Sequence, residues 1–127
     1  MISIDEMETI LEEISEQLPQ DFYKDLNGGV LLLPEAKLHD KSMGDDLYVM
    51  GEYHRDSSLG RYIAIYYGSF EKIYGFASRE QMKQQLMKTL KHEFRHHLES
   101  MAGDKSLEQI DAQDIGQYLQ RKTGQSI

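Results

Sequence analysis

Residues 81–100, QMKQQLMKTLKHEFRHHLES, contain the pattern that decides the fold. Apolar residues recur here at every fourth position, which is typical of a helix that turns one face to a hydrophobic core. These residues are Met82, Leu86, Leu90, Phe94 and Leu98. Ser78 and Gln81 form a capping box in front of the pattern. The spacing predicts a long amphipathic helix over residues 79–101, with Gly103 as its stop.

The last third of this helix contains two histidines with the spacing of a metal site. His92 and His96 are four residues apart, so their side chains project within about 40° of each other on one helix face. Glu93 completes the pattern H-E-x-x-H, in which the two histidines bind zinc and the glutamate acts as general base. On a helical wheel the two histidines point away from the apolar stripe. We therefore expect an exposed zinc site, with a pair of surface histidines that bind no metal as the alternative.

The neighbouring His97 falls on a different side of the helix. It lies about 140° round from His92 and projects between Leu90 and Phe94. We interpret His97 as a partly buried histidine that hydrogen-bonds the backbone or orients a neighbour of the metal, with direct ligation as the alternative.

A catalytic zinc also needs a third protein ligand and an open position for water. Glu99 is nearly flush with His92 on the wheel but lies two turns along the same helix. Asp104 follows Gly103, where we expect the chain to turn back toward the site, and it is the preferred candidate. More distant alternatives are Glu108, Asp111 and Asp114.

The rest of the chain predicts an α+β fold in a single domain over residues 1–127. Residues 4–18 have the apolar spacing of a helix, with a capping box of Ser3 and Glu6 in front. The run 30–33 reads as a strand that Pro34 ends or places at an edge, and 47–53 with 62–67 read as a hairpin. Residues 106–124 predict a short C-terminal helix. The expected order is a helix, about three strands, the long helix and a short helix.

Composition excludes several classes of function. The net charge of −8 argues against a nucleic-acid partner, because binding phosphates needs clustered Lys and Arg. The chain has no cysteine, which leaves His, Asp and Glu as its metal ligands. The longest apolar run, VLLL, is too short to span a membrane, and the N-terminus lacks the features of a secretion signal. We expect a cytoplasmic protein without a membrane partner, and a monomer by default.

The segment HEFRHH (residues 92–97) resembles the minimal-zincin family of small bacterial zinc metallopeptidases, whose signature is H-E-x-x-H-H on a long helix. The layout before it is also similar: a helix that ends in EQLP, a YVMGEY segment and a strand YIAIYYGSF. The resemblance implies a zincin-like minimal fold, with His92 and His96 as zinc ligands and Glu93 as base. This sequence departs from the family where Glu99 replaces a glycine and where Met101 and Ala102 occupy the places of the acidic third ligand.

These observations predict a zinc-dependent metallopeptidase that acts on a peptide or protein substrate. We expect an extended peptide to pair with the edge of a strand over residues 62–69, with Tyr66, Tyr67 and Gly68 as contact residues. The tyrosines of this stretch also have a simpler interpretation as sheet packing. Two other functions stay open: a zincin-like binding or regulatory module without peptidase activity, and a metal-dependent hydrolase of a non-peptide bond.

Overall fold

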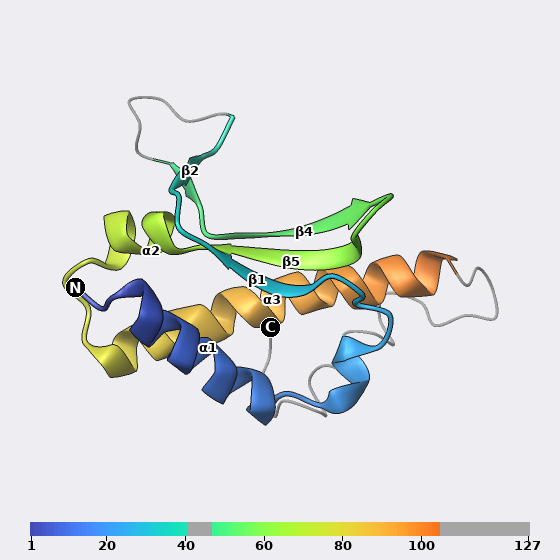
Figure 1. Ribbon diagram of the computed structural model, residues 1–127, viewed down its shortest axis with the longest axis horizontal. Helices are drawn as coiled ribbons and strands as arrows, with labels where there is room; N and C mark the ends of the chain where they lie inside the picture. The colour runs from blue at the N-terminus through green and yellow to red at the C-terminus, as the bar shows by residue number, and fades with distance from the viewer. Residues whose placement is uncertain (41–46, 105–127) are drawn as a thin grey trace.

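The structure is a computed structural model, and it describes residues 1–40 and 47–104 (Figure 1). Its elements in chain order are α1 (Ile4–Gln17), the 3-10 helix η1 (Gln20–Tyr23), β1 (Gly29–Leu33), β2 (Lys37–Leu38), β3 (Tyr48–Val49), β4 (Gly51–Asp56), β5 (Gly60–Tyr66), α2 (Tyr67–Tyr74) and α3 (Arg79–Asp104). The predicted α+β class is confirmed. The predicted C-terminal helix over 106–124 lies outside the described residues.

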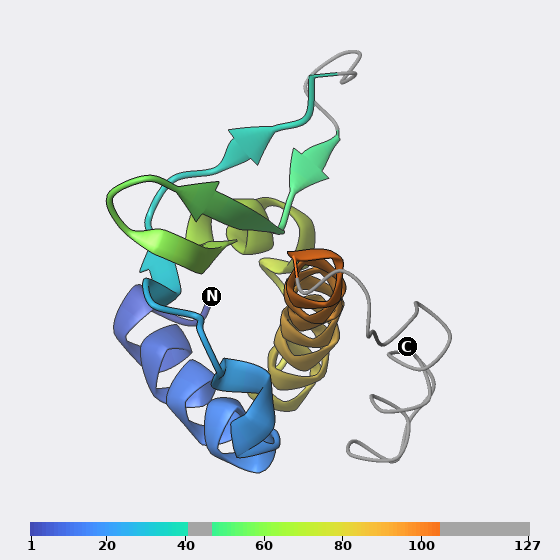
Figure 2. The same ribbon diagram turned by 90° about the vertical axis from the view of Figure 1, so that its right-hand side faces the viewer.

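Within residues 1–40 and 47–104, five short strands form two sheets. The larger sheet has the order β1-β5-β4, in which β1 runs parallel to β5 and β4 forms an antiparallel hairpin with β5. The strands β2 and β3 pair separately. Figure 2 shows α1 and α3 packed below the larger sheet, while the β2–β3 pair projects above it. The predicted edge strand is confirmed, and the predicted hairpin is confirmed with other bounds. The run 47–53, predicted as one strand, is divided between β3, which pairs with β2, and β4, which extends to Asp56.

The core lies between the sheet, α1 and α3. Its fully buried large side chains are Phe22, Phe70, Phe94, Met7, Ile10, Ile14, Ile63, Ile65, Met82, Leu86 and Leu90. The every-fourth-residue stripe of α3 supplies four of them, as its spacing predicts. Phe94 packs its ring against those of Phe22 and Tyr23, at centroid distances of 5.7 and 4.8 Å. The motif helix is therefore held by its buried face, which leaves the opposite face free for chemistry.

Both predicted capping boxes have hydrogen bonds at their helix starts. The Ser3 hydroxyl accepts from the backbone N–H of Glu6 at 3.1 Å. At α3 the exchange is reciprocal: the Gln81 N–H donates to Ser78 Oγ at 3.1 Å, and the Ser78 N–H donates to Gln81 Oε1 at 2.9 Å. Each bond satisfies a donor that the first helical turn leaves without a partner. The start of the motif helix is thus fixed by local chemistry.

Two sequence-based predictions are wrong in this region. The strand β5 is central, since β1 pairs with one side and β4 with the other, so it offers no edge to a peptide. The strand also ends at Tyr66, and Tyr67 and Gly68 begin helix α2. The chain turns here because the Gly68 N–H donates to the Glu35 carbonyl and Ser69 Oγ accepts from the Lys37 N–H. The uninterrupted run of apolar and aromatic residues concealed this boundary.

The end of α3 also differs from the prediction. The helix continues through Gly103 to Asp104, the last residue that the structure describes, so the chain does not turn back at the glycine. In addition, no helix within the described residues is long and apolar enough to cross a membrane.

Gly68 provides a test of this packing. We expect Gly68→Ala to destabilise the chain by about 1–3 kcal/mol, because overpacking forces the backbone to move. A methyl group at this position would lie 2.6 Å from the Glu35 carbonyl carbon. Urea unfolding measures the effect. The matched control is Gly103→Ala, where the new methyl group meets no described atom within 4 Å and helix propensity predicts a gain of about 0.5–1 kcal/mol. Equal stability of Gly68→Ala and the parent chain would contradict the packing.

Candidate metal centre

His92 and His96 lie on the exposed face of α3, as the helical wheel predicts. Their Nε2 atoms are 3.2 Å apart, and their rings are nearly perpendicular with centroids 4.7 Å apart. Partial burial, followed by the nearby charges of His96 and Arg95, lowers the pKa of His92 below its usual value. A lowered pKa favours neutral imidazole, which is the form that binds metals.

The donor set fits a zinc ion. Two nitrogens that each lie about 2.0–2.1 Å from a tetrahedral zinc are about 3.3–3.4 Å apart. The 3.2 Å between the two Nε2 atoms is close to that separation, so a small movement of either ring accommodates an ion. Within the described residues, however, no group of three His, Cys, Asp or Glu side chains is placed to hold a metal. The described part of the chain thus supplies two ligands of the expected set.

Glu93 lies between the histidine face and the core, and only 6% of its surface is exposed. Its carboxylate accepts a hydrogen bond from the backbone N–H of Tyr53 in β4. Two effects raise the pKa of Glu93 to about 7: mainly burial of the carboxyl group, and secondly the negative charge of Glu52. A carboxyl group whose pKa is near the operating pH is suited to take up and return a proton.

His97 is fully buried, and both of its ring nitrogens are hydrogen-bonded. The Nε2 atom is 2.8 Å from the backbone carbonyl of Lys24. Since a carbonyl only accepts, Nε2 is the nitrogen that bears the hydrogen. The Nδ1 atom is 2.9 Å from the Tyr53 hydroxyl and so accepts from it. With both nitrogens engaged inside the core, His97 has none free for a metal, which agrees with the interpretation of a buried orienting residue.

Tyr53 joins the edge strand to the motif helix through two bonds. Its main-chain N–H binds Glu93, and its hydroxyl binds His97 one helical turn further along α3. Both interactions come from one residue of β4, so they fix the distance between the strand and the helix and the alignment of one along the other. Sequence reasoning assigned no role to Tyr53, because its partner is 44 residues away. The segment YVMGEY that contains it belongs to the resemblance described above.

The two acidic candidates for the third ligand are placed differently. Glu99 Oε1 approaches His96 on its Nδ1 side at 3.7 Å, and Glu99 Oε2 lies 3.8 Å from Arg95 Nε. Glu99 therefore orients the His96 ring from behind instead of sharing the Nε2 side with an ion. Asp104 ends α3, about 12 Å along the axis from His96 at 1.5 Å per residue. Asp104 could bind the same ion as His96 only if the last turns of the helix unwound. Its role as the third ligand stays a prediction.

A groove of about 1040 Å³ begins at His92 and Glu93. Met50 and Gly51 line it from the start of β4, and Gln85 and Lys88 line it from α3. Its volume is at the upper end of the usual range for small-ligand sites. The groove gives an extended molecule access to the base and to the first histidine.

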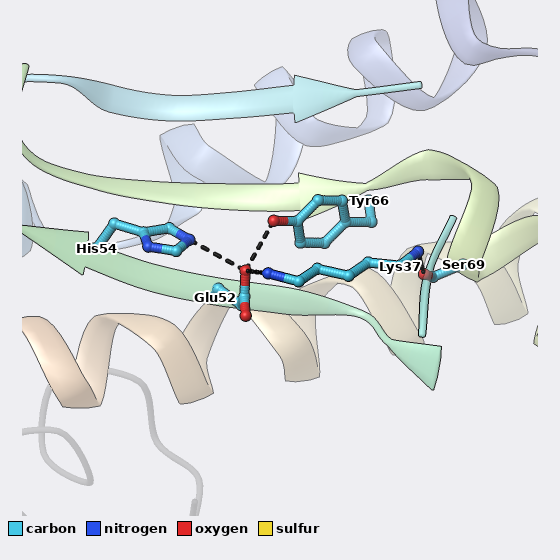
Figure 3. A network of polar contacts seen from close by, with 5 residues as sticks. All are labelled: Lys37, Glu52, His54, Tyr66 and Ser69. Atoms are coloured by element: carbon cyan, nitrogen blue, oxygen red, sulfur yellow. Dashed lines mark hydrogen bonds and ion pairs between the residues drawn. The ribbon is translucent and has the colours of Figure 1, made fainter. Parts of the chain in front are cut away.

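A second polar cluster lies on β4, and sequence reasoning missed it. Glu52 Oε1 accepts from Lys37 Nζ at 2.6 Å, from the Tyr66 hydroxyl at 2.7 Å and from His54 Nε2 at 3.0 Å (Figure 3). Tyr66, a predicted substrate contact, is thus a partner of Glu52. A glutamate within a strand is unfavourable unless it has partners, so its position in LYVMGEYH was the available signal.

A solved structure resembles this fold along most of the chain. It belongs to a conserved hypothetical protein from Thermus thermophilus, and it superposes with a TM-score of 0.69 at 34% sequence identity. The match covers 80% of this chain and 99% of that protein. No protein-family model matches this chain, and no curated protein matches it either.

The buried Tyr53–His97 bond predicts a stability effect. We expect Tyr53→Phe to cost about 1–3 kcal/mol, because it leaves the buried Nδ1 of His97 without a donor. Tyr62→Phe is the control: it removes the same oxygen from the neighbouring strand and retains the ring that stacks on His54. Urea unfolding of the two variants measures the difference. Equal stabilities would show that the bond contributes nothing.

The raised pKa of Glu93 predicts a pH dependence in the metal-free chain. The folded pKa of about 7 lies above the ordinary value of 4.5, so the folded state holds a proton that the unfolded state releases. The contribution of Glu93 to the free energy of unfolding is complete below pH 4.5 and is lost as the pH rises to about 7. The total loss is up to about 3 kcal/mol.

This loss is measured as the difference in unfolding free energy between the parent chain and Glu93→Gln, from about pH 4 to about pH 8 with a chelator present. Other carboxylates cancel in the difference, because both proteins share them. A difference that does not change with pH would contradict the raised pKa.

Proposed function

This chain belongs to the same family as the conserved hypothetical protein of Thermus thermophilus, and we propose that it is a zinc-dependent peptide hydrolase. His92 and His96 are the proposed ligands and Glu93 is the proposed general base. The observation that carries the proposal is the 3.2 Å separation of the two exposed Nε2 atoms, directly beside a buried carboxyl group whose pKa is about 7.

A bound zinc ion supplies Lewis-acid activation of a water molecule and of the scissile carbonyl. Glu93 takes a proton from the attacking water and returns it to the nitrogen of the leaving amine. The N–H of Tyr53 holds the carboxylate in place during both transfers. The C–N bond breaks as the water oxygen bonds to the carbonyl carbon, and the products are an acid and an amine.

The edge of β4 that no other strand of the described residues covers is the proposed binding site for the substrate backbone, in place of β5. The Tyr66 N–H donates to the Met50 carbonyl, so Met50 directs its backbone groups toward β5. Since these directions alternate along an antiparallel strand, Gly51, Tyr53 and Arg55 direct theirs away from β5. The bond from the Tyr53 N–H to Glu93 agrees with this alternation. An extended peptide added at this edge runs directly above the base and the histidine pair.

The third ligand completes the proposal, and Asp104 remains its candidate. For Asp104 to bind, the last turns of α3 must leave the helical course that they follow in this structure. The alternative function is a zincin-like binding or regulatory module without peptidase activity. That alternative is favoured by the absence of a three-ligand group within the described residues.

Metal analysis combined with turnover tests the proposal. We expect about one zinc per chain in the purified protein and in Glu93→Gln, and loss of zinc in His96→Ala. Peptide turnover should fall at least about 100-fold in Glu93→Gln, because that variant removes the base and retains the ligands. Elemental analysis and cleavage of a mixed peptide library give the two readouts.

Matched controls are His39→Ala, which removes an exposed histidine elsewhere, and Glu12→Gln, which removes an exposed carboxylate of α1. Asp104→Ala in the same assay decides the third ligand. A chain that holds no zinc after reconstitution, or a Glu93→Gln variant with full turnover, overturns the proposed function.

A further inference from the structure

The groove beside the histidine pair differs in charge from the chain as a whole. The chain has 22 acidic and 14 basic residues, which give it a net charge of −8. Among the described residues that line the groove, lysines outnumber acids: they are Lys83, Lys88, Lys91, Glu80 and Glu93. Since Glu93 is the proposed base, three lysines face one other glutamate in the described part of the lining. Such a lining favours a ligand with negative charge.

Of the three lysines, Lys88 is the one whose ammonium group is available to a ligand. Lys83 Nζ lies 3.4 Å from Glu13 Oε2, so its charge already has a partner on α1. Lys91 is buried. Lys88 is exposed, and within the described residues no hydrogen bond or ion pair holds its side chain. An anion that enters the groove therefore meets the charge of Lys88 without displacing another group.

Lys88 lies on the same side of α3 as the proposed metal site. It precedes His92 by four residues, so the two side chains are neighbours on one helix face, with Cβ atoms about 5–6 Å apart. Along the helix axis the offset is about 6 Å, at 1.5 Å per residue. An extended peptide spans about 3.3 Å per residue, so this offset corresponds to about two residues. A group bound by Lys88 thus belongs to about the second residue from the one held beside His92.

The edge of β4 gives the same spacing independently. Tyr53 lies at the level of Glu93, whose carboxylate accepts its N–H. Gly51 lies at the level of Thr89, since a methyl group on Gly51 would meet Thr89 Cγ2 at 2.9 Å. Two residues of β4 therefore advance as far as four residues of α3, in the same direction. A peptide on this edge that places one residue opposite Tyr53 places the second residue from it opposite Gly51, at the level of Lys88.

The alternation of side chains sets the direction in which that second residue points. The Tyr53 hydroxyl reaches His97, and a methyl group on Gly51 would point at Thr89, so both positions face α3. Residues directly opposite each other on paired antiparallel strands share a face of the sheet. The peptide residue opposite Gly51 therefore directs its side chain toward the helix that carries Lys88.

We propose that Lys88 binds an acidic side chain of the substrate, so that the chain cleaves peptides about two residues from an Asp or a Glu. This inference rests on the proposed hydrolase function. A C-terminal carboxylate has the same chemistry, but the groove continues past Lys88 for about two more helical turns, to Glu80. That length is about 12 Å, which accommodates about three or four further residues of an extended peptide. The substrate thus continues beyond the bound carboxylate, which favours a side chain over a chain end.

Binding of matched peptides tests the inference apart from turnover. The probes are alanine-rich octapeptides, blocked at both ends, with one Glu or one Gln at the fourth position. We expect the full chain with Glu93→Gln, loaded with zinc, to bind the Glu peptide about fivefold more tightly than the Gln peptide. Isothermal titration calorimetry measures the ratio, which should fall as salt is added because the pair is exposed. A Gln peptide with a free C-terminus should bind no more tightly than its blocked form.

Two substitutions in the same zinc-loaded background separate Lys88 from charge in general. Lys88→Met removes the ammonium group from an exposed position and should make the two affinities equal. Lys72→Met makes the same change of net charge at an exposed position of α2, away from the groove lining, and should preserve the ratio. Zinc content and circular dichroism verify that both variants are folded.

Three outcomes of these titrations overturn the inference. The first is equal binding of the Glu and Gln peptides without a substitution at Lys88. The second is a ratio that Lys88→Met leaves unchanged. The third is a gain in affinity from the free C-terminus in place of the Glu side chain, which would assign Lys88 to the chain end.

Product analysis distinguishes failure of this inference from failure of the proposed function. The parent chain should cut the Glu peptide at a fixed distance of about two residues from the Glu, and moving the Glu by one position should move the cut by one. Mass spectrometry of the products locates the cut. Cleavage of the Glu and Gln peptides at the same positions leaves the hydrolase proposal intact and overturns the role of Lys88. A preference for the Glu peptide without any cleavage supports the Lys88 site and counts against the hydrolase.

Discussion

The contact between β4 and α3 is the constraint on which the proposed site depends. Tyr53 forms it with two groups, a main-chain N–H on Glu93 and a hydroxyl on His97. His97 in turn donates to the carbonyl of Lys24, which links the helix to the segment before β1. This chain of bonds sets the distance between the strand edge and the helix. An edge strand nearer to α3 would close the cleft, and one further away would leave Glu93 without its donor.

Helix α3 combines a core face and a chemical face because the two lie on opposite sides of one cylinder. Leu90 and Phe94 are fully buried, while His92 and His96 are exposed. Glu93 falls at the boundary between them, where a carboxyl group is desolvated by the core and still reaches the cleft. The position of the base between the two faces follows from a residue step of about 100°, and its raised pKa follows from that position.

The features that the sequence predicted are local. The capping boxes and the stripe of α3 depend on residues three or four positions apart, and the same is true of the exposed histidine pair. The features that it missed depend on distant partners: Tyr53 with His97, and Glu52 with Lys37. The position of β5 within the sheet also belongs to this class, because the strand that covers its second edge, β1, comes far earlier in the chain. The start of α2 was missed because aromatic residues continue across it.

A buried base has a cost that the rest of the fold must offset. Raising the pKa of Glu93 means that its ionised form is disfavoured inside the folded chain, so the reactive form is also the less stable one. The packing around Phe94 and the hydrogen bonds of His97 offset the cost of ionising Glu93, because they hold the helix in place when the carboxyl group is charged. A cation bound close to Glu93 acts in the same direction, since its charge stabilises the ionised carboxylate. Binding of a cation and the ionisation of the base are therefore coupled: whatever brings positive charge close to Glu93 also favours the form of Glu93 that accepts a proton.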